Sequence, residues 1–162
     1  MTALITFDEQ QGVFHLHNRK ISYLLALEEG GVLSHLYFGS AIDGYHGQLR
    51  YPRVDRGFSG NLPGHTDRTY SLDTLPQEYS ASGDSDYRLP AAIIEHADGS
   101  RAARWIFKDY QIVDGKPELA GLPQAFVEDK TEAQTLIINL VDEVSHLELA
   151  LSYTIYREQA II

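Results

Sequence analysis

Two-residue alternation of apolar and polar side chains near the end of the chain constrains its fold more than any other feature. Between residues 147 and 156 every second position is apolar; this set is Leu147, Leu149, Leu151, Tyr153 and Ile155. Successive side chains of a β-strand point to opposite faces, so the pattern predicts a strand with one buried and one solvated face. Leu136, Ile138 and Leu140 repeat the pattern just upstream.

Other short runs rich in β-branched and aromatic residues predict further strands. They lie at residues 4–7, 13–17, 21–28, 32–38, 92–96 and 104–113. The pairs Asp98-Gly99 and Asp114-Gly115 suit type I′ hairpin turns, because both positions tolerate positive φ. No segment of ten or more residues holds a convincing helical period. The chain is therefore predicted to be all-β, a single antiparallel β-sandwich domain over residues 1–162.

The stretch between residues 39 and 91 interrupts this pattern. It holds four of the six prolines and seven of the thirteen glycines, which argues against regular strands there. Loops longer than about 15 residues are uncommon and are usually functional or disordered. Disorder goes with few aromatics, whereas this stretch holds five of the ten tyrosines. We predict one long ordered loop that packs on the domain, presents polar groups and carries the function.

Charge and composition exclude several classes of partner. A net charge of −10 repels phosphate backbones and anionic lipid, so we expect no nucleic acid and no membrane partner. No apolar run approaches the roughly 20 residues that span a bilayer, and the first residues do not resemble a signal peptide. The absence of cysteine excludes disulfides, thiolate metal sites and a cysteine nucleophile. We expect a cytoplasmic protein without a metal or other cofactor.

The last three residues, Ala160-Ile161-Ile162, are apolar and follow directly on a predicted strand. Domains rarely end on bare apolar residues with nothing to bury them. We therefore expect the chain to be truncated partway through a larger sheet.

Five stretches of the sequence carry a family resemblance: DRGFSGNLPG, DRTYSLDTLPQEY, LPAAIIEHADGSR, DYQIVDGKPELAGLPQAFVED and LSYTIYRE. Together and in this order, they resemble the N-terminal region of bacterial α-galactosidases of glycoside hydrolase family 36. The resemblance runs from about Ile5 to Glu158. It implies a large N-terminal β-sandwich (a supersandwich, of which this chain is roughly the first half), a catalytic (β/α)8 barrel and a small C-terminal β domain.

The resemblance also implies where catalysis lies. A retaining glycosidase uses two carboxylates about 5–5.5 Å apart, and in this family both are aspartates of the barrel. We therefore expect no catalytic residue in this chain. Asp84 and Asp86, beside Gly83, are interpreted as turn residues that bond to nearby backbone N–H groups.

Asp55 and Arg56 are the candidate substrate-binding residues. The resemblance implies that the long loop reaches an active-site mouth, in tetramers that of a neighbouring subunit. An aspartate accepts two sugar hydroxyls, and an arginine can fix that aspartate or donate to the sugar. The alternative is an Asp–Arg pair that merely braces the loop. Arg68 and Asp73 are assigned to bracing.

For the other candidate residues, structural roles are favoured over metal binding or sugar stacking. His15 and His17 lie two residues apart on a predicted strand and share one face, but no third metal ligand is recognisable. Trp105 and the aromatic residues of the long loop, including Phe58, are interpreted as packing residues rather than sugar-stacking platforms.

Three functions of different classes remain open at this point. The first is the non-catalytic N-terminal domain of a retaining α-galactosidase acting on terminal α-galactosides of oligosaccharides, in a homo-oligomer that is a tetramer in the family. The second is a free-standing carbohydrate-binding module, and the third is a purely structural β-sandwich.

Overall fold

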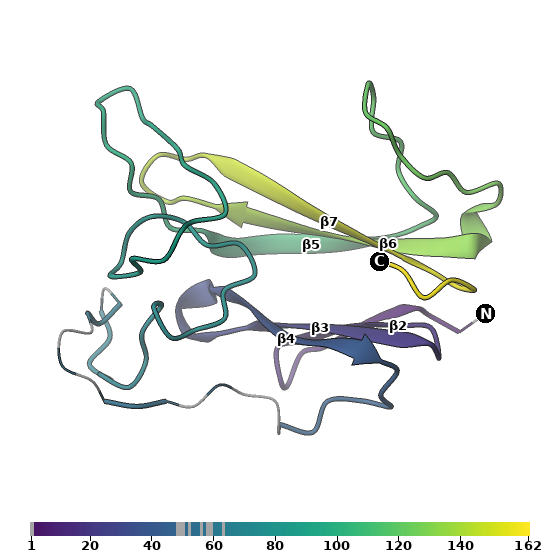
Figure 1. Cartoon of the computed structure of the whole chain (residues 1–162), viewed down its shortest axis with the longest axis horizontal. Coiled ribbons are helices and arrows are strands. Elements are labelled where there is room, and N and C mark those ends of the chain that lie inside the picture. Colours follow the sequence, from purple (N-terminus) through teal and green to yellow (C-terminus); the bar gives the residue numbers. More distant parts are fainter. Residues whose placement is uncertain (1, 48–50, 52, 56, 58–59, 63) are drawn as a thin grey trace.

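Two antiparallel sheets lie face to face as two layers in the computed structural model of the chain (Figure 1). The structure describes residues 2–47, 51, 53–55, 57, 60–62 and 64–162. The first sheet has the strand order β1-β2-β3-β4, formed by Ile5–Asp8, Val13–His17, Ile21–Leu27 and Leu33–Ser40. The second has the order β5-β6-β7, formed by Ile106–Asp114, Ala133–Val141 and Glu148–Tyr156. The prediction of an all-β antiparallel fold is confirmed.

The alternating pattern that predicted β6 and β7 sets which side chains enter the core. Leu136, Ile138 and Leu140 are fully buried on one face of β6, as predicted. On β7 burial increases along the strand: Leu149 is half-buried and Ile155 is fully buried. β7 is an edge strand with a neighbouring strand on one side only, so fewer side chains cover the face that it turns to the core.

The core between the layers draws on both sheets. Its fully buried members are Phe14, Leu16 and Leu25 from the first sheet, with Leu136, Ile138, Leu140 and Ile155 from the second. The opposite face of the first sheet is covered by the chain that follows β4. There Tyr45 packs against Val13, Leu24 and Ala26. Burial of both faces explains why nearly every residue of β2 is buried.

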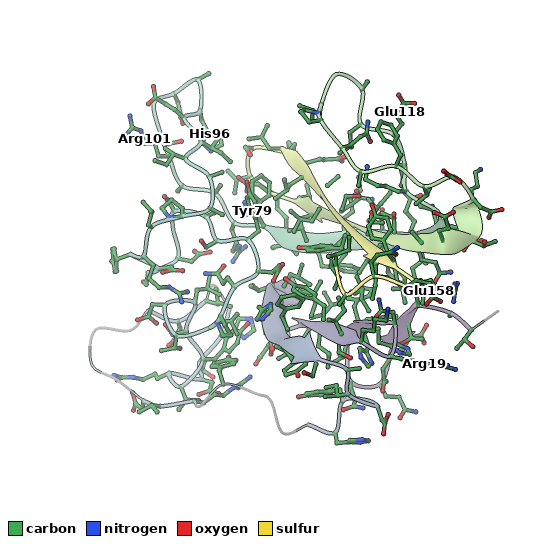
Figure 2. All side chains as sticks on the ribbon, turned by 45° about the vertical axis from the view of Figure 1, so that its right-hand side comes forward. Arg19, Tyr79, His96, Arg101, Glu118 and Glu158 are labelled. Carbon is green, nitrogen blue, oxygen red and sulfur yellow. The ribbon has the colours of Figure 1, made fainter. Side chains whose placement is uncertain are left out.

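The predicted strand at residues 92–96 is wrong. These residues belong to a projection that extends away from both sheets (Figure 1), and Figure 2 shows His96 and Arg101 at its outer end. The projection closes on itself, since Gly99 N donates to His96 O at 2.9 Å and His96 N donates to Ser100 O at 2.9 Å. A two-stranded ribbon without a third neighbour is marginal, so the β-prone sequence forms a turn and no ladder.

The Asp114-Gly115 pair ends β5 as predicted but does not make a tight hairpin. The chain returns in β6 only at Ala133, after a loop that contains the short 3-10 helix η2, Lys130–Glu132. Gly115 has φ of +80°, and a Cβ there would lie 3.2 Å from the Cα of Lys130. The glycine therefore lets the two ends of the loop meet at its base, where Gly115 N donates to Ala133 O at 2.8 Å.

The described residues of the long loop pack on the domain, as predicted. They build a small core of their own over the 3-10 helix η1, Glu29–Gly31, from Val32, Leu62, Tyr70, Leu72 and Leu75. Near its end the loop runs antiparallel to β4. His35 N donates to Pro76 O at 2.8 Å and Glu78 N donates to Leu33 O at 3.0 Å. These bonds attach the loop to the outer edge of the first sheet.

Neither helical segment in the described ranges is long and apolar enough to cross a membrane.

Candidate functional site

The candidate site is an exposed cluster of charged side chains on the long loop. Two ion pairs join the segment around Asp55 to the segment around Asp67. Arg53 Nη1 lies 3.3 Å from Asp67 Oδ2, and Arg68 Nε lies 3.2 Å from Asp55 Oδ1. Asp55 belongs to the dipeptide Asp55-Arg56 and Arg68 to the dipeptide Asp67-Arg68, so the acidic member of one pairs with the basic member of the other. Arg56 lies outside the described residues.

A buried tyrosine supports this cluster from below. Tyr70 is completely buried, and its hydroxyl donates to Glu29 O at 2.6 Å. The guanidinium of Arg53 lies over its ring, 4.9 Å from the centroid. His65 Nδ1 and Glu29 Oε1 are 2.9 Å apart, which ties a further loop residue to η1. The cluster is therefore fixed to the first sheet through η1.

Asp67 has a turn-forming role of its own. Its Oδ1 accepts from Thr69 N at 2.8 Å and from Thr69 Oγ1 at 2.6 Å. These bonds from Thr69, with the nearby charge of Arg53, lower the pKa of the Asp67 carboxyl. The Asp67 carboxylate therefore bonds to the loop backbone as well as to Arg53.

Asp55 is the more open of the two aspartates. Its side chain is 61% exposed, and the side chain of its partner Arg68 is 58% exposed. Exposed ion pairs of this kind contribute at most about 1 kcal/mol to stability, because water screens both charges. A carboxylate held on an ordered loop by one arginine, yet open to solvent, can still accept hydrogen bonds from a polar ligand. The position suits both alternatives for Asp55, a brace and a ligand contact.

An ion pair between a buried carboxylate and a half-exposed arginine holds the second half of the loop. Arg88 forms a bidentate pair with Asp86, with Nε 2.9 Å from Oδ1 and Nη2 2.8 Å from Oδ2. The same guanidinium donates to Leu72 O at 2.6 Å and Leu75 O at 2.9 Å, and Gln77 Nε2 donates to Asp86 at 2.7 Å. Burial raises the pKa of Asp86, but the hydrogen bonds and charge of Arg88 outweigh it, so the pKa is lowered. This pair fixes the path of residues 72–88.

Both Asp84 and Asp86 lie in a turn, as predicted, but the predicted bond to a backbone N–H is shown for Asp86 alone; the side chain of Asp84 lies 3.5 Å from Arg104 Nε, and the prediction missed the ion pair of Asp86 with Arg88. Asp84 and Ser85 have positive φ, and Asp86 N donates to Gly83 O at 3.0 Å, closing a tight turn. The side chain of Asp86 is only 1% exposed. The sequence signal was the Asp-X-Arg spacing, in which Asp86 Oδ1 also accepts from Arg88 N at 3.1 Å.

Glu78 joins the long loop to both sheets. Its Oε1 accepts from Tyr23 of β3 at 2.5 Å and from Tyr153 of β7 at 2.8 Å. Its Oε2 lies 3.3 Å from His35 Nδ1 of β4, and its side chain is only 10% exposed. Burial, together with hydrogen bonding to Glu78, raises the pKa of both tyrosines, which keeps them as donors. Sequence reasoning missed this role, although Glu78 lies in the motif DTLPQEY.

The histidine pair and Trp105 have structural roles in the fold, whereas Tyr87 of the long loop is 90% exposed, so the packing role predicted for it is wrong. His15 is buried, with Nε2 2.9 Å from Ser22 Oγ, and its ring lies 4.6 Å from that of His17. Burial, with the nearby His17, lowers the pKa of His15 to about 4. No group of metal-ligand side chains is arranged to hold an ion within the described ranges. Trp105 is buried in the main core, as predicted, and Phe58 lies outside the described residues.

A comparison with known protein families shows which family this chain belongs to. The model of the glycosyl hydrolase family 36 N-terminal domain matches residues 31–162. The chain belongs to that family. The resemblance inferred from the five sequence stretches is thereby confirmed.

Relatives of this family 36 N-terminal domain are much longer proteins. Alpha-galactosidase 1 of Pediococcus pentosaceus is 62% identical over 160 residues, which cover 99% of this chain and 22% of that protein. The crystal structure of the family 36 α-galactosidase AgaB of Geobacillus stearothermophilus has a TM-score of 0.87 and 43% identity, covering 98% of this chain and 21% of that one. A double variant of AgaA of the same organism, solved in complex with raffinose, has a TM-score of 0.84 and 44% identity over 90% of this chain and 20% of its own. The chain thus spans about a fifth of the relatives it matches.

Proposed function

We propose that the complete protein is a retaining α-galactosidase acting on terminal α-galactosides of oligosaccharides, and that this chain is its non-catalytic N-terminal domain. The observation that carries the proposal is the match to α-galactosidases over nearly the whole chain, at 62% identity to the Pediococcus enzyme. The solved complexes of AgaA with raffinose and with stachyose support oligosaccharides as the substrate class.

Within this enzyme, the long loop shapes the substrate pocket through Asp55 and Arg56. Asp55 supports this role because its carboxylate is held by Arg68 and remains mostly exposed. Arg68 ties Asp55 to the segment that precedes Tyr70, and the Tyr70 hydroxyl bonds that segment to Glu29 O, which gives the carboxylate a point of attachment to the domain. An open carboxylate on a fixed loop can accept sugar hydroxyls once another part of the protein completes the pocket.

Two further features of this proposal concern the cell and the assembly. We place the enzyme in the cytoplasm, in keeping with its acidic, cysteine-free sequence. We also propose a homo-oligomer, in which the long loop of one subunit reaches the active-site mouth of its neighbour. The exposed ion pair of Asp55 and Arg68 on this loop suits such a contact.

The test compares this 162-residue chain with the complete protein on a chromogenic α-galactoside. The complete protein should turn over the substrate, and the isolated chain should not, because the catalytic carboxylates are expected outside it. Calorimetric titration of the isolated chain with raffinose should show no binding at millimolar sugar. Turnover by the repurified chain would refute the proposed division of labour, and raffinose binding would favour a free-standing carbohydrate-binding module.

A further inference from the structure

A cleft beside the β2–β3 turn gathers positive charge in an otherwise acidic chain. It has a volume of about 320 Å³ and lies between the first residues, that turn and the segment that follows β7. Its lining holds Arg19, Lys20 and Arg157 against one acidic residue, Glu158, which Figure 2 shows at the same end of the domain as Arg19. The whole chain has 13 basic and 23 acidic residues, so the cleft reverses the overall charge. A concave site of this kind attracts anions.

Hydrogen bonds to backbone carbonyls hold two of these three cations in place. Arg157 Nε donates to Thr131 O at 3.0 Å, and Arg157 Nη1 donates to Thr2 O at 3.2 Å. Lys20 Nζ donates to Glu158 O. Within the described part of the chain, these bonds leave Arg157 Nη2 and two hydrogens of the Lys20 ammonium free to donate to a ligand. Donors that are already held in position lose less conformational freedom when a ligand binds.

A buried asparagine fixes the β2–β3 turn itself. Asn18 is only 7% exposed, and its Nδ2 donates to Tyr156 O at 2.5 Å and to Gln159 O at 2.6 Å. Its Oδ1 accepts from Lys20 N at 3.0 Å and from Ile21 N at 3.1 Å. The turn that lines the cleft is therefore attached to the last strand of the second sheet and to the segment that follows it.

Arg19 is the cation of the cleft that gains least from the fold. Its φ is +70°, a backbone conformation that favours glycine. Its guanidinium has five N–H donors, yet it forms no hydrogen bond or ion pair with any residue that the structure describes. Residues held in such sparsely populated conformations cluster at functional sites. An arginine on this turn is therefore better explained by a ligand than by stability.

The donors of the cleft favour a small anion that carries a phosphate group. Guanidinium groups bind phosphate and carboxylate through paired hydrogen bonds. A phosphate group offers three strong acceptor oxygens, which suit donors that come from separate segments of the chain. Small-molecule sites begin at about 300 Å³, so the cleft takes a small ligand. The acidic remainder of the chain repels a polyanion such as nucleic acid.

We infer that this cleft binds the phosphate group of a small soluble anion, either inorganic phosphate or a sugar phosphate, through Arg19, Lys20 and Arg157. A bound phosphate joins the β2–β3 turn to the segment that follows β7, so it stabilises the folded domain in proportion to its concentration over its Kd. The inference depends neither on a role of Asp55 nor on α-galactosidase activity.

The experiment titrates the complete protein with inorganic phosphate and, separately, with glucose 6-phosphate, at constant ionic strength in a calorimeter. At least one of the two should bind with a Kd on the order of 1 mM or tighter. The melting temperature should rise with that ligand but not with chloride at the same ionic strength. Tighter binding of the sugar phosphate identifies the ester as the ligand, and tighter binding of inorganic phosphate identifies the free ion.

Arg19→Gly separates binding from folding, because glycine suits the positive φ and only the side chain is lost. Without ligand its melting temperature should equal or exceed that of the unmodified protein. Phosphate binding should weaken about tenfold or more, since hydrogen bonds between charged groups are removed. Arg19→Lys, which keeps the charge without the planar fork, should weaken binding by less. Arg101→Ala is the control, because Arg101 is 64% exposed, pairs with Glu95 and lies far from Arg19 in Figure 2; it should leave binding unchanged.

Three results would overturn the inference. The first is that neither phosphate compound binds to the complete protein. The second is that Arg19→Gly and Arg19→Lys bind as tightly as the unmodified protein, because the anion then sits elsewhere. The third is a crystal structure of the complete protein, grown with phosphate, in which another part of the polypeptide fills the cleft. The readouts are binding and melting, so a complete protein without α-galactosidase activity would contradict the proposed function and leave this inference standing.

Discussion

The hydroxyl of Tyr153 donates to the carboxylate of Glu78 at 2.8 Å, across 75 residues of sequence. This bond links the edge strand of the second sheet to the long loop, which is itself paired along the edge of the first sheet. Glu78 therefore ties the second sheet to the long loop and to the first sheet, with which the second sheet shares no strand pairing.

Removing this bond should destabilise the domain measurably. We predict that Tyr153→Phe lowers the free energy of unfolding by about 1.5–3 kcal/mol, since a hydrogen bond to a charged, largely buried acceptor is lost. Tyr37→Phe is the matched control, because its hydroxyl donates to Ser40 O at an exposed position and should cost about 0.5 kcal/mol. Urea unfolding of the isolated chain measures both. Equal losses of unfolding free energy in the two variants would show that the hydrogen bond from Tyr153 to Glu78 contributes no more than an exposed one.

The ion pair of the buried Asp86 carboxylate with Arg88 leads to a second prediction. Asp86→Asn should lower the free energy of unfolding by about 1.5–3 kcal/mol, since Arg88 loses a charged, bidentate acceptor that no water replaces on the buried side. Asp98→Asn, in the exposed turn where Asp98 caps Ser100 N at 2.9 Å, should change it by less than about 0.5 kcal/mol. Melting curves of the two variants test this prediction. If Asp86→Asn destabilises the domain as little as Asp98→Asn does, the ion pair of Asp86 and Arg88 is dispensable for stability.

His15 should make the stability of the domain depend on pH. Burial depresses its pKa in the folded state to about 4 from an ordinary value of 6.5. Above pH 6.5 the ring is neutral in both states and costs nothing. As the pH falls below 6.5 the unfolded chain binds the proton first, so stability is lost between pH 6.5 and 4. The loss amounts to about 2 kcal/mol at pH 5.

A neutral replacement should remove that dependence. In His15→Gln the difference in unfolding free energy between pH 7 and pH 5 should shrink by about 2 kcal/mol relative to the unmodified chain, whatever the variant costs at pH 7. Chemical denaturation of both proteins at pH 7 and at pH 5 gives the four unfolding free energies that this comparison needs. Parallel pH profiles for the two proteins would mean that His15 takes up its proton in the folded state without penalty.

Much of the fold follows from local sequence. Alternation placed β6 and β7, and β-branched runs placed the four strands of the first sheet within a few residues. The failures have a common cause. Residues 92–96 have strand-like composition but no neighbouring strand, and Asp114-Gly115 has turn chemistry but opens a long loop. Composition indicates which local conformations a segment can adopt, whereas a β-strand also needs a neighbouring strand to pair with, which only the tertiary fold supplies.

The candidate site was predictable in kind but not in its pairing. The long loop could be recognised as ordered because it is rich in tyrosine, and Tyr70 does bury itself in a local core. Adjacent charges in sequence suggested a pair between Asp55 and Arg56, which lies outside the described residues; the pair of Asp55 with Arg68 that the structure shows was not foreseen. Residues that meet through the fold of an irregular loop leave no periodic signal, and Glu78 was missed for the same reason.

The most direct test of the substrate role of the loop compares Asp55→Ala with Arg68→Ala in the complete protein. Both variants break the same exposed ion pair, whose loss alone should change kcat/KM by no more than about fivefold. If Asp55 contacts the sugar, its removal should lower kcat/KM on raffinose by roughly ten- to a hundred-fold, with the melting temperature and oligomer mass unchanged. Arg68→Ala should stay within about fivefold of the unmodified enzyme. Equal, small losses in both variants, with a lowered melting temperature, would contradict the substrate role and make Asp55 a brace of the loop.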